Sequence, residues 1–523
     1  MTYRHPKMKN KLSGFWILTL SLALFTLLIH LFTCTNYELH RDELLYMALG
    51  RHLSFGYMST PPLMGFLGFL LQHLFGYSGP AIKLLPALSG TFSVIVIALM
   101  VRELGGKNFA VAIACSAFIL SPAFLRSDNQ FMPVPFDEFF WLALAYLALL
   151  LVNTQNEKLW IAIGALTAIA FLNKYSIVFF AGALFISLLL SPHRTLLRSK
   201  YLAYGLVLAF IIASPNLYWQ AQHHFPVITH MGELRRTQLV NENPFTFTMG
   251  QLLMNMPGLF IWLTGLLCLL FLKTERKFRF IAISYVIAMA FLMAGKGKAY
   301  YALGAYPMLF AAGGYTLEKY FIGKLTWLKY LFIANALLVG VLIMPLSLPV
   351  LPLEKMVDYC KLSSQFIGSW PTRWEDGKNH LLPQDYADET GWIQLSDLVV
   401  SAYQSLDSAG QKSCMIYTND YGQASAIQYY GKQKGLPDPV SMSDAFLFWA
   451  PDSTDKTTLI YVGRNPGKLD TLFNTYALFG ILRNKYFRED GLQVFVCQNP
   501  KPYWKTYYTG NVRELKKEIA INQ

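Results

Sequence analysis

A short polar stretch follows the first apolar segment of the chain: Asn36-Tyr37-Glu38-Leu39-His40-Arg41-Asp42-Glu43-Leu44. It leads to a turn with two adjacent prolines, Tyr57-Met58-Ser59-Thr60-Pro61-Pro62-Leu63, before apolar sequence resumes. The adjacent carboxylates of Asp42 and Glu43 are therefore expected at the end of a membrane span. Ionisable groups at that depth are costly and usually have a partner or a function. The pattern predicts an active site at a membrane surface.

The composition is that of a membrane protein. Of the 523 residues, 54% are hydrophobic and 14% are charged, and the mean hydropathy is +0.34. A soluble protein carries about 25% charged residues. The formal net charge of +13 would also fit a nucleic-acid binder. However, the positive residues lie in short loops between apolar segments, which the positive-inside rule explains, so no nucleic-acid partner is expected.

Apolar segments predict eleven membrane spans, near 13–33, 84–101, 109–125, 138–152, 159–172, 176–190, 201–214, 250–272, 280–294, 301–317 and 328–348. Some are short, so broken or tilted helices are expected. The first follows the basic residues Arg4, Lys7, Lys9 and Lys11 and lacks a small-residue cleavage site, which predicts an uncleaved span with a cytoplasmic N-terminus.

Charge also predicts which side of the membrane each loop faces. Alternating the spans from a cytoplasmic N-terminus puts Lys or Arg in every short loop on the cytoplasmic side. The periplasmic side then receives the long segments, 34–83, 126–137, 215–249 and everything after about 350. A multi-pass membrane protein, with its active site at the periplasmic face, is the expectation.

The composition changes after about residue 350, where three prolines follow the last apolar segment. Helical and strand patterns then alternate: helix Ser396–Leu406, strand Ser413–Thr418, helix Gln423–Lys432, strand Thr458–Val462, helix Lys468–Arg483 and strand Leu492–Cys497. This alternation predicts a periplasmic α/β domain over 351–523, after a transmembrane domain over 1–350.

The six cysteines leave disulfide formation open. Cys115 and Cys268 fall inside apolar spans and are expected to be packing residues. Cys34, Cys360, Cys414 and Cys497 are expected outside the cytoplasm, where a disulfide is permitted. The sequence does not pair them.

Asp42 and Glu43 are the candidates for catalysis, and Asp42 is the leading one. An enzyme that moves a sugar to a hydroxyl or amine needs a carboxylate to accept the proton of the nucleophile. Glu43 points elsewhere on a helix, so the two acids need not share a role. The alternative is that Asp42 only caps a helix that begins near Glu43.

Several cations and tyrosines on the predicted outer side could bind a phosphate. Lys174 lies in Asn173-Lys174-Tyr175, and Lys298 lies in Gly295-Lys296-Gly297-Lys298-Ala299-Tyr300-Tyr301. Cations neutralise a leaving phosphate and tyrosine hydroxyls hydrogen-bond to it. The candidates for this role are Arg51, Tyr57, Lys174, Lys298, Tyr300 and Tyr301. The alternative for each Lys is snorkelling to lipid headgroups, and for Tyr57 a simple interfacial turn.

Weaker candidates for contacts with a sugar or an acceptor are Asp128, Asp137 and Trp219. Asp128 and Asp137 frame the second outer loop. For Asp137, which precedes Glu138 and a run of aromatic residues, helix capping is the favoured interpretation. Trp219 could equally belong to an aromatic belt. No Cys/His spacing typical of a metal site is present.

Six groups of residues occur along the chain in the same order as in a known family. They are Arg41-Asp42-Glu43-Leu44-Leu45-Tyr46, Gly50-Arg51-His52 with Gly56-Tyr57 and Pro61-Pro62-Leu63, Phe136-Asp137 with Trp141, Asn173-Lys174-Tyr175-Ser176, Pro215-Asn216 with Trp219-Gln220, and Gly297-Lys298-Ala299-Tyr300-Tyr301 with Tyr306-Pro307. Through them the chain resembles a bacterial membrane glycosyltransferase of the GT-C superfamily, in the protein-mannosyltransferase-like group (family 39), to which the lipid A aminoarabinose transferase is related. The C-terminal domain resembles the periplasmic domains of such enzymes through Tyr386-Ala387-Asp388 with Gly391-Trp392 and through Asn419-Asp420-Tyr421-Gly422.

The resemblance implies a polyprenyl-phosphate-sugar donor, an inverting displacement at the anomeric carbon, Asp42 as the base, and contacts of Lys174, Lys298 and nearby tyrosines with the lipid phosphate. Two departures matter. Relatives carry an acid linked to phosphate or metal handling where this chain has Ser59, so a divalent metal is doubtful. The lipid A enzymes have Arg and Lys where this chain has Leu45 and Thr60, which disfavours aminoarabinose transfer to lipid A.

With this resemblance, the sequence predicts a polyprenyl-phosphate-dependent glycosyltransferase of the bacterial inner membrane that acts on a periplasmic protein, lipid or glycan. The alternative from another class is a transporter or lipid flippase, although no internal repeat is visible and the charged motifs lie at span ends. A third alternative is a non-catalytic relative that holds a partner enzyme through its α/β domain.

Overall fold

The computed structural model describes residues 9–237 and 239–518, so Arg4 and Lys7 lie outside the described residues. The chain divides into two compact units. One, here called the membrane unit, comprises Met1–Cys34, Lys83–Pro215 and Arg235–Leu348. The other, the mixed unit, comprises Thr35–Ile82, Asn216–Leu234 and Pro349–Gln523.

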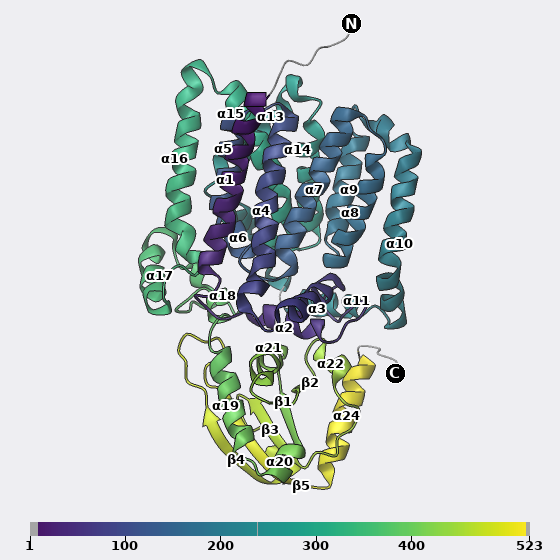
Figure 1. The fold of residues 1–523 in the computed structure, drawn as a ribbon, viewed down its shortest axis with the longest axis vertical. Helices are drawn as coiled ribbons and strands as arrows, with labels where there is room; N and C mark the ends of the chain where they lie inside the picture. Colours follow the sequence, from purple (N-terminus) through teal and green to yellow (C-terminus); the bar gives the residue numbers. More distant parts are fainter. Residues whose placement is uncertain (1–8, 238, 519–523) are drawn as a thin grey trace. The chain divides into compact units, whose positions relative to one another are not determined.

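Apolar helices form the membrane unit and run side by side in Figure 1. They are α1 (Lys9–Thr33), α4 (Gly79–Leu104), α5 (Asn108–Leu120), α6 (Pro122–Ser127), α7 (Pro133–Thr154), α8 (Leu159–Asn173), α9 (Ile177–Leu189), α10 (Lys200–Gln222), α12 (Pro244–Met254), α13 (Leu259–Phe271), α14 (Arg279–Ala294), α15 (Tyr306–Tyr320) and α16 (Thr326–Ile343). Among the described residues, five helices are long and apolar enough to cross a membrane, or six if one bent pair counts as a single span.

Each of the eleven apolar segments contains helix, which confirms the helical fold class. The segment 250–272 is not one straight helix, because α12 and α13 meet at an angle of 113°. The break coincides with Pro257 and Gly258, residues that disfavour helix continuation. An apolar helix within 34–83, α3 (Leu63–Phe75), was not expected. The number of spans and their sidedness stay predictions.

Glycines permit close contacts between helices of the membrane unit. A Cβ atom on Gly265 of α13 would lie 2.5 Å from the backbone nitrogen of Gly313 on α15. No side chain fits at that separation. Small residues at such crossings let helix backbones approach closely, which is how helices associate within a membrane.

The mixed unit contains a five-stranded sheet with strand order β2-β1-β3-β5-β4. The strands are β1 (Cys414–Thr418), β2 (Val440–Ser441), β3 (Thr458–Gly463), β4 (Phe473–Ile481) and β5 (Gln493–Pro500). β1 pairs in parallel with β2 and β3, whereas β5 is antiparallel to β3 and β4. Helix α24 (Tyr503–Glu518) packs Trp504 and Tyr508 into the core of the sheet, beside Leu459 and Cys497.

Further helices of the mixed unit come from three separate parts of the sequence. They are α2 (Arg41–Gly50), α3, α11 (Pro226–Thr237), α17 (Leu353–Ile367), α18 (Gln384–Ala387), α19 (Trp392–Gln404), α20 (Ser408–Lys412), α21 (Tyr421–Ala426), the π-helix Ile427–Gly431, α22 (Phe446–Trp449) and α23 (Leu469–Leu472). Figure 1 labels α2 and α21, which are in contact.

The prediction of a C-terminal α/β sheet is confirmed, but the expected helix over Lys468–Arg483 is wrong. Only Leu469–Leu472 is helical there, and Phe473–Ile481 forms the edge strand β4 against β5. Phe, Thr, Tyr and Ile favour a strand when a partner strand is available, and the local sequence does not reveal that partner. All six cysteines, which lie among the described residues, are free thiols.

Candidate active site

The N-terminus of α2 separates the roles of the two adjacent acids. His40 is the N-cap, and its Nδ1 accepts a hydrogen bond from the Asp42 backbone N–H at 3.1 Å. The Glu43 Oε2 in turn accepts one from the His40 backbone N–H at 2.8 Å. This reciprocal pair is a capping box. The interpretation of Asp42 as the helix cap is therefore wrong, and its carboxylate is available for other contacts.

Glu43 is fully buried and takes part in holding the first turn of α2. We expect a Glu43→Gln variant to keep most of the protein's activity, because glutamine can accept the same capping hydrogen bond. A Glu43→Ala variant should lower the melting temperature instead. Thermal unfolding in detergent, measured beside activity, checks both. A Glu43→Gln variant that folds normally but is inactive would contradict a purely structural role.

Asp42 is partly buried and is held by a tyrosine of the C-terminal sequence. The Tyr421 hydroxyl donates a hydrogen bond to the Asp42 Oδ1 at 2.7 Å. Burial raises the pKa of Asp42, while the positive charge of Arg41 and the hydrogen bond from Tyr421 lower it. Among the residues that the structure describes, none makes a hydrogen bond to Oδ2. One carboxylate oxygen is thus fixed by a hydrogen bond, and the other is not.

Arg41 organises the same group of residues. Its guanidinium lies over the Tyr421 ring, 4.6 Å from the centroid, and donates hydrogen bonds to both carboxylate oxygens of Asp420 at 2.9 and 3.1 Å. Arg41 is 8% exposed. A buried arginine that binds a carboxylate with two hydrogen bonds and stacks on an aromatic ring is geometrically well defined. It fixes the ring whose hydroxyl contacts Asp42.

A second C-terminal segment also holds the start of α2. The Asp388 carbonyl accepts a hydrogen bond from the Arg41 backbone N–H at 3.2 Å. Its buried carboxylate pairs with Arg488 at 2.8 Å, and burial raises the pKa of Asp388 to about 7. The Glu38 Oε2 accepts hydrogen bonds from the backbone N–H groups of Trp392 and Ile393, at 2.7 and 3.2 Å, at the start of α19.

Arg51 and Tyr57, expected to contact a phosphate, are both engaged within the mixed unit. Arg51 donates to both oxygens of Asp438 at 2.7 and 3.1 Å. Tyr57 is 2% exposed, and its hydroxyl donates to the Leu49 carbonyl and accepts from the Ser54 backbone N–H, each at 3.2 Å. These contacts favour structural roles for both residues.

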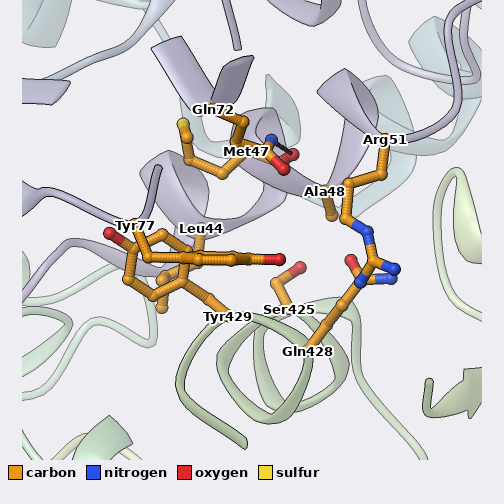
Figure 2. A pocket seen from close by; sticks show the side chains of 9 residues that line it. All are labelled: Leu44, Met47, Ala48, Arg51, Gln72, Tyr77, Ser425, Gln428 and Tyr429. Carbon is orange, nitrogen blue, oxygen red and sulfur yellow. Dashed lines mark hydrogen bonds between the residues drawn. The ribbon is translucent and has the colours of Figure 1, made fainter. Parts of the chain in front are cut away.

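Arg51 also lines a pocket with Tyr77, Ser425, Gln428 and Tyr429. Figure 2 shows these side chains around one small space between α2 and the C-terminal helices. Its free volume is about 10 Å³, on the order of a single water molecule. A sugar phosphate does not fit there in this conformation.

Trp219 and Ser59 contact the last part of the chain. Trp219 stacks on His223, with 4.2 Å between ring centroids, and meets the edge of Phe448 at 5.9 Å. Ser59 donates a hydrogen bond to Asp444 at 3.2 Å. The chain therefore has a carboxylate next to position 59, although it comes from a distant part of the sequence.

A second polar cluster lies in the membrane unit, around Lys174 at the end of α8. Its ammonium group lies 3.7 Å from the Asp137 Oδ2, and 5.4 and 4.9 Å from the ring centroids of Tyr300 and Tyr301. The Asp137 carboxylate also accepts from Trp141 Nε1 at 3.0 Å and from the Ser176 hydroxyl at 2.9 Å. Four sequence-predicted residues thus come together here.

Asp137 does not cap α7, so that favoured interpretation is wrong. The helix begins at Pro133 with Met132 as its N-cap, which places Asp137 one turn further on, where it orients Lys174. Lys298 is the N-cap residue of the 3₁₀ helix Ala299–Ala305, which carries both tyrosines. The glycines and cations of that motif therefore position Tyr300 and Tyr301.

Asp128 is buried, with 2% of its surface exposed. A Cβ atom on Gly90 of α4 would lie 2.1 Å from the Asp128 Oδ2, so only glycine leaves room for this carboxyl. Within the described parts of the chain, no group of three or more His, Cys, Asp or Glu side chains could hold a metal ion.

The sequence did not identify four residues that surround Asp42: Asp388, Asp420, Tyr421 and Arg488. Three of them belong to the C-terminal motifs that carry the family resemblance, but the motifs gave no role. They lie more than 340 positions from Asp42 in the sequence. Only the fold brings them to α2.

A family model, a curated relative and solved structures are similar to this chain. Residues 59–219 match the family model described as dolichyl-phosphate-mannose-protein mannosyltransferase. The lipid A galacturonosyltransferase RgtD of Rhizobium johnstonii is 26% identical over 226 residues, which cover 42% of this chain and 46% of that protein. The match thus spans less than half the length of this relative.

The solved structures of ArnT from Cupriavidus metallidurans match almost the whole fold. The structure with bound undecaprenyl phosphate has a TM-score of 0.63 at 14% identity, and covers 92% of this chain and 98% of that one. The apo structure has a TM-score of 0.62 at 15% identity, with the same coverage. The chain has the fold of these ArnT structures, and its apolar helices make it a membrane protein.

Proposed function

We propose that this chain, which has the GT-C fold and resembles ArnT, is an inverting glycosyltransferase that moves a sugar from a polyprenyl-phosphate donor to an acceptor in the periplasm. The observation that carries the proposal is the carboxylate of Asp42, held at Oδ1 by Tyr421 and close to the positive charge of Arg41. A fixed carboxylate is what a general base requires.

In the proposed reaction, the acceptor oxygen attacks the anomeric carbon of the sugar while its proton moves to the Asp42 Oδ2. The bond between the anomeric carbon and the phosphate oxygen breaks, and the polyprenyl phosphate leaves with the bonding electrons. Attack opposite to the leaving group inverts the configuration. The base removes the positive charge that would otherwise develop on the acceptor oxygen.

We also propose that the Lys174 cluster, within the membrane unit, binds the phosphate of a polyprenyl-phosphate lipid. Lys174 supplies a positive charge, and Tyr300 and Tyr301 supply hydroxyl groups, beside a carboxylate that orients the cation. Preorganised cations and donors stabilise charge that develops on a leaving phosphate. Lys298, next to the tyrosines in the sequence, is a further candidate for the same phosphate.

The names of the relatives point to the substrates to test first. RgtD is a galacturonosyltransferase acting on lipid A, and ArnT was solved with undecaprenyl phosphate. Undecaprenyl-phosphate-linked galacturonic acid and lipid A are therefore the first pair. Mannose and aminoarabinose donors, and protein and glycan acceptors, complete the panel.

The test uses the full chain, purified in detergent or nanodiscs, with radiolabelled donors of this panel. Transfer of label to an acceptor, or its release by hydrolysis, supports a transferase. Movement of intact donor across a vesicle membrane without bond cleavage would support the flippase alternative instead. Absence of both bond cleavage and transfer across the panel would contradict the proposal.

The pH dependence of transfer follows from the environment of Asp42. A base acts in its ionised form, and burial raises the pKa of Asp42 above that of a free aspartate. We therefore expect the rate to fall as the pH is lowered, with a midpoint above the ordinary aspartate value. Initial rates at saturating donor between pH 4 and pH 8 check this. A rate that rises toward acidic pH would contradict the assignment.

A further inference from the structure

The motif Asn419-Asp420-Tyr421-Gly422 follows β1 and includes the first two residues of α21. Asp420 is the N-cap of α21, and its Oδ1 accepts a hydrogen bond from the Gly422 backbone N–H at 2.7 Å. Tyr421 is therefore the first residue of the helix. The turn fixes the direction in which its side chain leaves the backbone.

Gly422 lets this turn approach α2. A Cβ atom at position 422 would lie 3.4 Å from the Arg41 Cβ, 3.3 Å from the Trp392 ring and 3.0 Å from an oxygen of Asp420. A larger side chain would have to separate α21 from α2. The motif thus combines a cap, a tyrosine and a glycine that brings the tyrosine to the first turn of α2.

We propose that Tyr421 is a positioning residue for Asp42, because its hydroxyl fixes Oδ1, leaves Oδ2 to the acceptor, and favours the ionised carboxylate. This inference rests on the proposed function of Asp42 as the base. Burial and the nearby Asp42 raise the pKa of Tyr421 well above its usual value, so the hydroxyl keeps the proton that it donates. The C-terminal sequence then has a defined part in the reaction.

Other charged and titratable groups also act on Asp42. Arg41 and Arg488 lower its pKa and Asp385 raises it. Asp42 in turn influences Tyr46, Asp388 and Asp444. None of these other groups donates a hydrogen bond to the Asp42 side chain among the described residues. Loss of the Tyr421 hydroxyl is therefore expected to remove the hydrogen bond that lowers the pKa of Asp42.

The test compares Tyr421→Phe with Tyr430→Phe. The Tyr430 hydroxyl accepts a hydrogen bond from the Leu39 backbone N–H at 3.4 Å, so it contacts the same N-terminal loop without touching Asp42. The assay is the transfer of galacturonic acid from its undecaprenyl-phosphate donor, or of whichever donor proves active. Initial rates are measured from pH 4 to pH 8.

Tyr421→Phe should lower the rate at neutral pH by about tenfold, since a hydrogen bond to a charged group is lost. The acidic limb of its pH profile, where the rate falls as the pH is lowered, should move to higher pH. The reason is that the Asp42 carboxylate loses a hydrogen-bond donor that favoured its ionised form. Tyr430→Phe should leave the acidic limb where it is. A wild-type pH profile for Tyr421→Phe, or an equal shift for Tyr430→Phe, would overturn the inference.

Two further variants keep the outcome interpretable. Replacing Tyr421 by 3-fluorotyrosine keeps the ring and the hydroxyl but makes the phenol a stronger donor, so the acidic limb should move to lower pH. This variant decides the matter if Tyr421→Phe does not fold. An active Asp42→Asn variant would remove the proposed function itself, whereas an inactive one beside an unchanged Tyr421→Phe profile would remove only the role of Tyr421.

Discussion

The Asp42→Asn variant is expected to fold normally and to lose transfer by at least about 100-fold, within the range that a general base contributes. Asparagine keeps an oxygen that can accept the Tyr421 hydrogen bond, so the contact between α2 and α21 should persist. It cannot accept the proton of the acceptor. Initial rates with saturating donor and acceptor, together with the melting temperature in detergent, measure both effects.

Asp397→Asn is a matched control for this experiment. Asp397 lies on α19 of the same unit, is exposed, and pairs with Lys434 at the surface. Its substitution makes the same change of charge and should leave transfer intact. Transfer by the Asp42→Asn variant at the wild-type rate would remove Asp42 from the mechanism, wherever the donor binds.

The second large effect is expected at Lys174. A Lys174→Met variant keeps the length and apolar body of the side chain but loses its charge, and transfer should fall by about 100-fold or more. Removing one preorganised group that stabilises developing negative charge typically has this magnitude. Because the charge acts on the phosphate, affinity for undecaprenyl phosphate, measured by competition with the donor, should fall as well.

Helix α8 offers the control for Lys174 at its other end. Lys158 is the N-cap residue of this helix and is exposed. Lys158→Met should therefore alter neither transfer nor the affinity for the lipid phosphate. Lys174→Arg restores the charge and should recover part of the activity. If Lys158→Met and Lys174→Met changed transfer and the affinity for the lipid phosphate to the same extent, both lysines would serve only membrane insertion.

Much of the fold could be predicted, because its signals are local. Each of the eleven runs of apolar residues contains helix in the structure. The alternation of helix and strand patterns after residue 350 predicted the sheet. Asp42 became a candidate for a similar reason, since a charge at the end of an apolar segment stands out. Lys174 and the two tyrosines became candidates in the same way, at the ends of other segments.

The remaining features depend on contacts between distant residues. The sequence could not assign Glu43 to a capping box rather than to catalysis, because that depends on where α2 begins. Asp438, the partner of Arg51, lies 387 positions away. Strand β4 was mistaken for a helix because its partner β5 stabilises it. Tyr421 stood in a recognised motif, yet its role appears only when α21 lies beside α2.

The composition of the mixed unit has a consequence for protein engineering. The segments Thr35–Ile82 and Asn216–Leu234 belong to the same compact body as Pro349–Gln523. A chimera that receives only the last third of a homologue would separate Glu38 and Arg41 from their partners Trp392 and Asp420 of this chain. Exchanging all three pieces at once is the graft that we expect to fold.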